Sequence, residues 1–186
     1  MMMLKNKMLS FNYRFVILFV LPVIFGFSSA DALPKHFPMP EFTNTNPNEW
    51  FNTKPLKRDD LKGKVVLLDI WTYGCWNCYR SFPWLNELEA KFSADAFIVI
   101  GIHTPEFEKE KKPSSVARNV RKFNLHHPVM MDNDFAYWKA LGNRYWPTFY
   151  IVDKQGIIRS RYIGETHSGD RNATRIEADI RQLLGE

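Results

Sequence analysis

Residues 65–78 read VVLLDIWTYGCWNC, and they contain the strongest structural signal in the chain. Their first seven residues form a continuous apolar run of strand length, which is typical of a central strand covered on both faces. Two cysteines, Cys75 and Cys78, follow directly. Residues 76–92 then show apolar side chains at helical spacing, although Pro83 is expected to kink that helix. A buried strand, a turn with two cysteines and a helix therefore follow one another.

These are the only two cysteines among the 186 residues. Two cysteines in an exported protein normally suggest one structural disulfide that closes a long loop. A disulfide across only two intervening residues closes so small a loop that it removes little entropy from the unfolded chain. Reactivity is therefore a better reason than stability for this pair.

The place of the pair in the strand-to-helix turn predicts different roles for the two thiols. Cys75, at the helix start, lies near unpaired backbone N–H groups and the positive end of the helix dipole, which favour a thiolate. Cys78 lies one turn further along the same face, close enough for a disulfide but shielded by the helix. We expect Cys75 to attack a substrate disulfide and Cys78 to resolve the mixed disulfide.

The rest of the chain is expected to form one domain, since 45% hydrophobic content in 186 residues supplies one core. Residues 31–60 are rich in Pro, Asn and Thr and predict an irregular lead-in with a short edge element. Strands are expected at 97–102, 128–131, 148–152 and 157–163, and helices at 114–123, 135–141 and 173–184. Strands that alternate with helices and end in a hairpin plus a helix indicate an α/β domain with a mixed sheet. Residues 106–112 are interpreted as a solvated charged segment.

The first thirty residues have the pattern of a secretory signal. Lys5, Lys7 and Arg14 lead into an apolar run at 15–27, which is followed by small residues. The alternative is an uncleaved membrane anchor, but 13 residues interrupted by Pro22 fall short of the ~20 that a spanning helix needs. The pattern therefore predicts a cleaved signal peptide and a domain in the periplasm or an equivalent exported compartment.

The charge balance gives no sign of nucleic-acid binding. The formal net charge is +5, and loss of residues 1–30 leaves 22 basic against 20 acidic residues, a net charge of +2. The alternative use of the cysteines is a metal site. One CxxC pair supplies two ligands, so a closed zinc site needs His103, His126 or His127 to converge on it. We expect no metal and no cofactor.

The motifs resemble those of the thioredoxin-like superfamily. Residues 68–71, the CxxC pair and Pro83 are similar to the thioredoxin active-site segment, and residues 146–151 resemble its cis-proline strand. Within the superfamily, the resemblance is to exported TlpA-like domains, particularly those of DipZ type; it is carried by residues 71–75, 101–107, 132–134 and 142–147. It runs from about Leu61 to the C-terminus. It implies a thioredoxin-like domain at 61–186, with a central mixed β-sheet flanked by helices on both faces.

The resemblance also implies roles for individual residues. Asp69 matches the buried carboxylate that assists proton transfer to the resolving cysteine, Pro147 the cis-proline beside the disulfide, and Trp71 an aromatic that lines the site. The sequence departs from the thioredoxin pattern at Gly74, where thioredoxins usually have Trp. It departs again at residues 76–77, Trp-Asn, which replace a Gly-Pro dipeptide. Residues at these positions tune the redox potential, so the direction of electron flow stays open.

Each of these residues also has an ordinary structural interpretation. A carboxylate inside an apolar strand is costly to bury without a function or a partner, but Asp69 at a strand end is also satisfied by solvent or by Lys64. Pro147 is alternatively a common edge-strand proline, since only ~5% of X-Pro bonds are cis. The aromatics around the motif, Trp76 and Trp146 among them, form either a docking surface for protein substrates or part of the core.

The leading functional hypothesis is an exported, monomeric thiol:disulfide oxidoreductase that acts on protein cysteines. The resemblance implies a membrane thiol electron donor and apocytochrome c as partners. A thiol peroxidase is an alternative, since Thr72-x-x-Cys75 resembles the peroxiredoxin motif, although Leu68 stands where that motif has proline. A Cu(I)-handling chaperone that uses both thiolates as soft ligands is another alternative.

The signal segment yields a direct prediction for the mature N-terminus. Cleavage after Ala30 or Ala32 leaves a chain that begins at Asp31 or Leu33, because both sites follow a pair of small residues. N-terminal sequencing of the protein recovered from the exported compartment measures this. A membrane-bound product that retains Met1 would show that the segment is an anchor.

Overall fold

The structure is a computed structural model that describes residues 36–186. The predicted signal peptide at 1–30 and its cleavage sites lie outside the described residues. Within residues 36–186, no helix is both long enough and apolar enough to cross a lipid bilayer.

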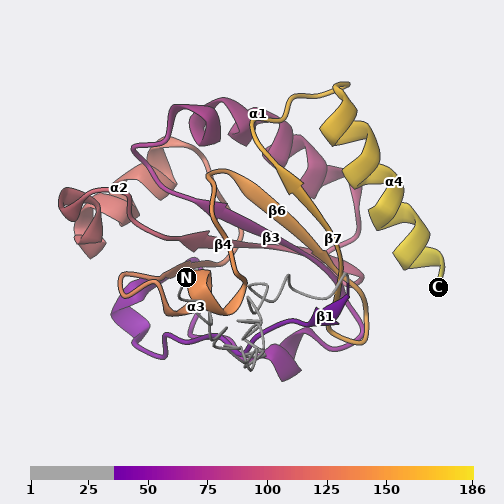
Figure 1. The fold of residues 1–186 in the computed structure, drawn as a ribbon, viewed down its shortest axis with the longest axis horizontal. Helices are drawn as coiled ribbons and strands as arrows, with labels where there is room; N and C mark the ends of the chain where they lie inside the picture. The colour runs from indigo at the N-terminus through magenta and orange to yellow at the C-terminus, as the bar shows by residue number, and fades with distance from the viewer. Residues whose placement is uncertain (1–35) are drawn as a thin grey trace, which may run out of the picture. The chain divides into compact units, whose positions relative to one another are not determined.

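A seven-stranded mixed sheet forms the centre of the described chain (Figure 1). Its spatial order is β1-β7-β6-β3-β4-β5-β2. Strands β3, β4 and β5 are parallel, whereas β6, β7, β1 and β2 run antiparallel to their neighbours. The strands are β1 Phe37–Pro38, β2 Trp50–Phe51, β3 Val65–Trp71, β4 Phe97–His103, β5 Val129–Met131, β6 Thr148–Val152 and β7 Ile157–Ile163. The helices are α1 Trp76–Lys91, α2 Pro113–Lys122, α3 Ala136–Ala140 and α4 Arg171–Gly185, with short 3₁₀ turns η1 Pro47–Glu49, η2 Arg58–Leu61 and η3 Glu108–Lys111.

Strand β3 occupies the centre of the sheet, as its apolar run predicted. It pairs with β4 on one edge and β6 on the other, and all seven of its residues are buried. Alternate side chains enter two separate cores, with Leu67 and Trp71 on one face and Leu68 and Ile70 on the other. Burial on both faces explains why the run is continuously apolar rather than alternating.

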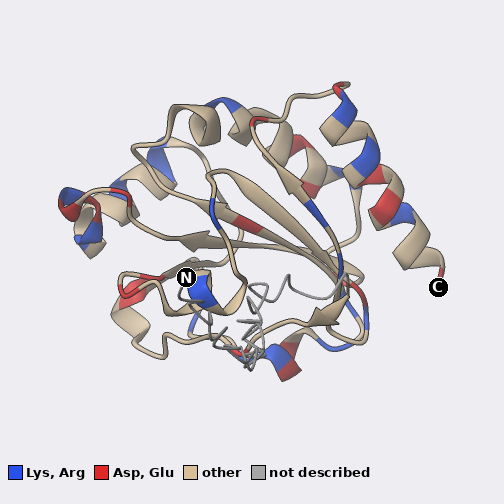
Figure 2. Cartoon of the chain, in the orientation of Figure 1, with Lys and Arg blue, Asp and Glu red and all other residues tan. Residues whose placement is uncertain are grey.

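Helices cover both faces of the sheet, which confirms the predicted α/β architecture with a central mixed sheet. Helices α1, α2 and α4 contribute the buried residues of the Trp71 face, including Leu85, Val116 and Ile176. Helix α3 and the lead-in cover the opposite face (Figure 1). The charged residues lie mainly on the helices and at the periphery of the sheet (Figure 2). Helix α1 continues through Pro83.

The lead-in is more closely integrated than one short edge element. It supplies both edge strands, because β1 pairs with β7 and β2 pairs with β5. Met39, Phe42 and Trp50 are buried against the same face as α3. These residues therefore complete one of the two cores.

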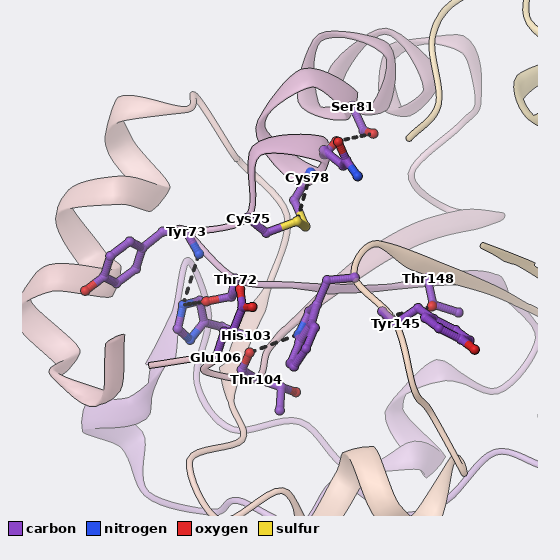
Figure 3. The surroundings of a disulfide bond; sticks show 12 residues. Thr72, Tyr73, Cys75, Cys78, Ser81, His103, Thr104, Glu106, Tyr145 and Thr148 are labelled. Carbon is purple, nitrogen blue, oxygen red and sulfur yellow. Dashed lines mark hydrogen bonds between the residues drawn. A yellow bond between two sulfur atoms is a disulfide. The ribbon is translucent and has the colours of Figure 1, made fainter. Parts of the chain in front are cut away.

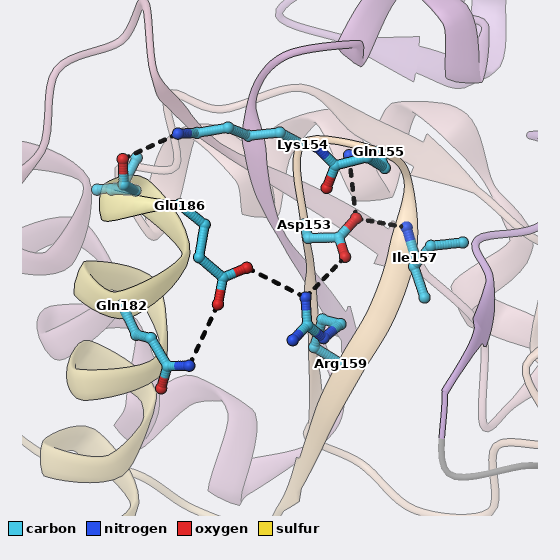
Figure 4. A network of polar contacts seen from close by, with 8 residues as sticks. Asp153, Lys154, Gln155, Ile157, Arg159, Gln182 and Glu186 are labelled. Carbon is cyan, nitrogen blue, oxygen red and sulfur yellow. Dashed lines mark hydrogen bonds and ion pairs between the residues drawn. The ribbon is translucent and has the colours of Figure 1, made fainter.

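The hairpin between β6 and β7 fastens the C-terminal helix to the sheet (Figure 4). Asp153 Oδ1 accepts hydrogen bonds from the backbone N–H groups of Gln155 and Ile157, while Oδ2 pairs with Arg159 at 3.0 Å. Arg159 also reaches Glu186, at 3.3 Å. Asp153 thus closes the turn and links it to the end of α4.

The packing of α1 on β3 predicts a large stability effect at Leu85, which is 0% exposed. We expect Leu85→Ala to lower the free energy of unfolding by ~2–5 kcal/mol, because a buried cavity replaces the side chain. Ile163→Ala, at a residue 43% exposed, is the control and changes stability by less than ~1 kcal/mol. Guanidinium unfolding of the oxidised proteins measures both values. Equal losses for the two variants would contradict the assigned core.

Candidate active site

The two cysteines lie where β3 gives way to α1. Cys75 is the N-cap residue of α1, and its extended backbone (φ −79°, ψ 113°) lets the sulfur face the first helical N–H groups. The backbone N–H of Cys78 donates to Cys75 Sγ at 3.1 Å (Figure 3). Cys75 is half-buried, whereas Cys78 is completely buried. The exposure of the two residues therefore differs in the sense expected for an attacking and a resolving thiol.

The cysteines are joined in a disulfide with their Cα atoms 5.3 Å apart. This separation is within the usual range for disulfides. The described structure therefore corresponds to the oxidised form of the pair.

Asp69 is a buried carboxylate on the same face of β3 as Cys78. Side chains alternate along a strand, and Leu67 and Trp71 on either side of Asp69 belong to the same core as Cys78. Asp69 is 1% exposed, and neither carboxylate oxygen has a hydrogen-bond partner. Lys64 does not supply one, because its ammonium group donates to the carbonyls of residues 94 and 95. Burial raises the pKa of Asp69 to about 8, so the carboxyl group is protonated at neutral pH.

The bond between Trp146 and Pro147 is cis, as the resemblance implied. The Trp146 indole N–H donates to the carbonyl of Thr104 at 3.1 Å, and the Thr104 N–H donates to the carbonyl of Trp71 at 3.0 Å. These bonds connect the segment around Pro147 to the ends of β3 and β4. Pro147 itself is buried.

Trp71 does not line an accessible surface, which corrects its assignment as a substrate-binding residue. It is 0% exposed and packs edge-on against Phe82 and His103. Its indole fills the space above Gly101, where an added Cβ would lie 2.9 Å from the indole nitrogen. Trp71 is therefore a core residue at the end of β3. It directly precedes residues 72–75, the cysteine turn that leads into α1.

The exposed aromatics beside Cys75 are Trp76 and Tyr79, which are 66% and 44% exposed with ring centroids 5.2 Å apart. Trp146 is partly buried and contacts Trp138, with ring centroids 4.2 Å apart. A cavity of about 270 Å³ opens beside Cys75. It is lined by Tyr73, Gly74, Cys75, Trp76, Tyr79, Lys122 and Phe123.

His103 lies under the cysteine turn, where its Nε2 faces the backbone N–H of Tyr73 at 3.4 Å and the Thr72 hydroxyl at 3.3 Å (Figure 3). Burial lowers the pKa of His103 to about 3, so the ring is neutral. Among the described residues, no three His, Cys, Asp or Glu side chains are grouped so as to hold a metal ion. His126 and His127 therefore do not converge with the cysteines on a zinc site.

Glu110 is a site residue that the sequence interpretation missed. It lies within the charged segment 106–112, yet it is 0% exposed. Its Oε2 accepts a 2.6 Å hydrogen bond from the Thr72 hydroxyl. That hydroxyl is consequently directed to a carboxylate rather than to Cys75, which is not the arrangement the peroxidase alternative requires. The alternating Glu and Lys residues of this segment do not indicate that the side chain of Glu110 is buried.

Known proteins resemble this chain over most of its length. The chain matches the model of the Redoxin family over residues 35–180. Protein DipZ of Mycobacterium tuberculosis is 40% identical over 140 residues, which cover 74% of this chain and 19% of that protein. Thiol-disulfide oxidoreductase YkuV of Bacillus subtilis is 26% identical over 149 residues, which cover 80% of this chain and 95% of that protein. The chain therefore spans about a fifth of DipZ but nearly all of YkuV.

A solved structure extends the comparison to the fold. The protein from Chlorobium tepidum assigned as thiol:disulfide interchange protein DsbE has a TM-score of 0.70 and is 25% identical. The match covers 83% of this chain and 100% of that one.

The buried Asp69 predicts a pH-dependent stability. Its folded pKa of about 8 lies above the ~3.9 of an unfolded aspartate, so between these values the unfolded chain releases a proton that the folded chain retains. Stability is therefore lost as the pH rises from ~4 to ~8 and levels off above. We expect Asp69→Asn to remove this decline, so that its stability relative to the wild type increases by several kcal/mol across the window.

Urea unfolding of both oxidised proteins between pH 4 and pH 9 measures the difference. Parallel pH profiles would show that Asp69 is ionised in the folded protein at neutral pH.

Proposed function

The chain belongs to the Redoxin family as a thioredoxin-like thiol-disulfide oxidoreductase, and from this we propose that it is exported and exchanges disulfides with protein cysteines through Cys75 and Cys78. The observation that supports this best is the asymmetry of the pair. The N-cap cysteine is partly exposed and its sulfur accepts a backbone N–H, while the second cysteine is completely buried.

Reduction of a client disulfide proceeds in two exchanges. The Cys75 thiolate attacks one client sulfur, so that a mixed disulfide forms and the other client sulfur leaves as a thiolate that takes up a proton. Cys78 then loses its proton and attacks Cys75, which releases the second client thiol. The client gains two electrons and two protons, and the Cys75–Cys78 disulfide remains. Oxidation of a client follows the same steps in reverse.

Asp69 is the proposed proton acceptor for Cys78. A buried thiol reacts only after it loses its proton, and no water reaches a sulfur that is 0% exposed. A carboxyl group whose pKa is raised by burial to about 8 gains and loses a proton near the working pH, which is the property a general base needs. Its place on the Cys78 face of β3 supports this role.

The client is proposed to bind beside Pro147 and over the exposed rings near Cys75. Trp76 offers a large apolar surface next to the attacking sulfur, and Trp146 precedes the cis-proline. Extended protein segments suit such a shallow aromatic surface, because burial of the rings supplies affinity without a deep pocket.

Export and the partners rest on the sequence pattern. The basic and apolar segment at 1–30 supports secretion, with residues 31–60 as the lead-in and 61–186 as the thioredoxin-like domain. A membrane thiol donor is the proposed source of electrons, and apocytochrome c is a proposed client. The domain is proposed to act as a monomer.

The division of roles predicts different trapping by the two cysteine variants. Cys78→Ser retains the attacking thiolate but has no resolving partner, so mixed disulfides with client proteins accumulate. Cys75→Ser traps none. Non-reducing electrophoresis and mass spectrometry of the exported fraction measure the adducts, with the double variant as the background control.

Trapping by Cys75→Ser alone would reverse the two roles. If neither variant traps a client and disulfide reduction persists, the dithiol mechanism fails.

A further inference from the structure

Glu110 presents an unusual arrangement beneath the cysteine turn. Three donors converge on its Oε2: the Thr72 hydroxyl at 2.6 Å and the backbone N–H groups of Glu106 and Phe107 at 2.8 and 3.3 Å. Its Oε1 is buried and has no hydrogen-bond partner among the described residues. A carboxylate is therefore fixed through one oxygen, while the other is left without a donor.

The unpartnered oxygen lies against Gly74, the residue directly before Cys75. A Cβ atom added to Gly74 would collide with Glu110 Oε1. Consecutive Cα atoms are ~3.8 Å apart, so this oxygen lies within roughly 8 Å of the Cys75 Cα. The arrangement also explains why glycine replaces the tryptophan that thioredoxins usually have here, since no larger side chain fits while Glu110 occupies the site.

The three hydrogen bonds on Oε2 fix the position of the Glu110 carboxylate beside Thr72 and Gly74. Burial, and then the negative charge on Glu110, raise the pKa of the neighbouring Tyr73. The other ionisable groups around Cys75 are Lys122, Tyr73 and Tyr79 in the cavity and the buried His103 and Asp69. His103 and Asp69 are uncharged at neutral pH, so Lys122 is the cation of this set.

We propose that Glu110 is a positioning residue that holds the turn before Cys75 and places a negative charge there, which makes the cysteine pair more reducing. This inference rests on the proposed dithiol function. A negative charge near the sulfur disfavours the Cys75 thiolate and hence the reduced form of the pair. The pair consequently gives up its electrons more readily.

A more reducing pair favours electron flow from the domain to its clients. The reduced pair passes two electrons and two protons to a client disulfide, which becomes a dithiol as the Cys75–Cys78 disulfide forms. A dithiol donor protein then reduces that disulfide and is itself oxidised to a disulfide. The substrates are therefore oxidised proteins. The domain itself must be re-reduced by a dithiol protein after each turnover.

Glu110→Gln tests the charge while it preserves the shape, because the amide oxygen is able to accept the same three donors. We expect Cys75 to ionise at a pH about one unit lower, measured by the pH dependence of its alkylation rate in the reduced protein. The equilibrium with glutathione is expected to shift by up to ~10-fold toward the reduced pair, which corresponds to ~30 mV. Glu110→Asp, which keeps the charge, should stay close to the wild type in both measurements.

Glu108→Gln is the matched control, because it removes the same charge from the same segment at a side chain that is 85% exposed and paired with Lys111. We expect no shift in this variant. Gly74→Ala provides an independent approach if Glu110→Gln does not fold, since the added methyl group displaces the carboxylate and should shift both measurements in the same direction.

An unchanged alkylation profile and glutathione equilibrium in folded Glu110→Gln would overturn the inference, while client trapping by Cys78→Ser would still support the proposed function. Equal shifts in Glu108→Gln would also overturn it. If the wild-type pair shows no exchange with glutathione at all, the proposed function fails as well.

Discussion

The pairing of β3 with β4 and β6 is the constraint on which the site depends. A strand buried on both faces and paired along both edges has no freedom to change its register, because a shift of one residue would exchange the two cores. That register directs Asp69 toward the α1 face and ends the strand where Cys75 caps the helix. The cysteine pair is thus positioned by the buried strand at the centre of the sheet.

In the proposed mechanism, two buried carboxylates with opposite environments act on the cysteine pair. Asp69 has no hydrogen-bond donor, so burial keeps it protonated at neutral pH and allows it to accept a proton once ionised. Glu110 has three hydrogen-bond donors on one oxygen and none on the other. In the proposed mechanism, one carboxylate serves the resolving thiol and the other sets how readily the pair gives up electrons.

The sequence was sufficient for features that depend on local patterns. Periodicity and position predict the buried strand β3, the β6–β7 hairpin and the different exposure of the two cysteines. The structure agrees with all three. Trp71 was misplaced because a strand-end aromatic has the same pattern whether it faces substrate or core. Glu110 was missed because its burial depends on contacts with residues 72–74, almost forty positions away. The cis bond before Pro147 was foreseen through the family resemblance, since the dipeptide itself favours trans.

The most direct test of the account is a redox titration of the wild-type Cys75–Cys78 pair at pH 7, with the dithiol fraction measured by alkylation. A reversible two-electron transition near the potential of thioredoxin, ~−270 mV, is the result that a reductant predicts. A midpoint near the ~−120 mV of a strong oxidant would contradict the proposed direction of electron flow. The absence of any transition would contradict the dithiol chemistry itself.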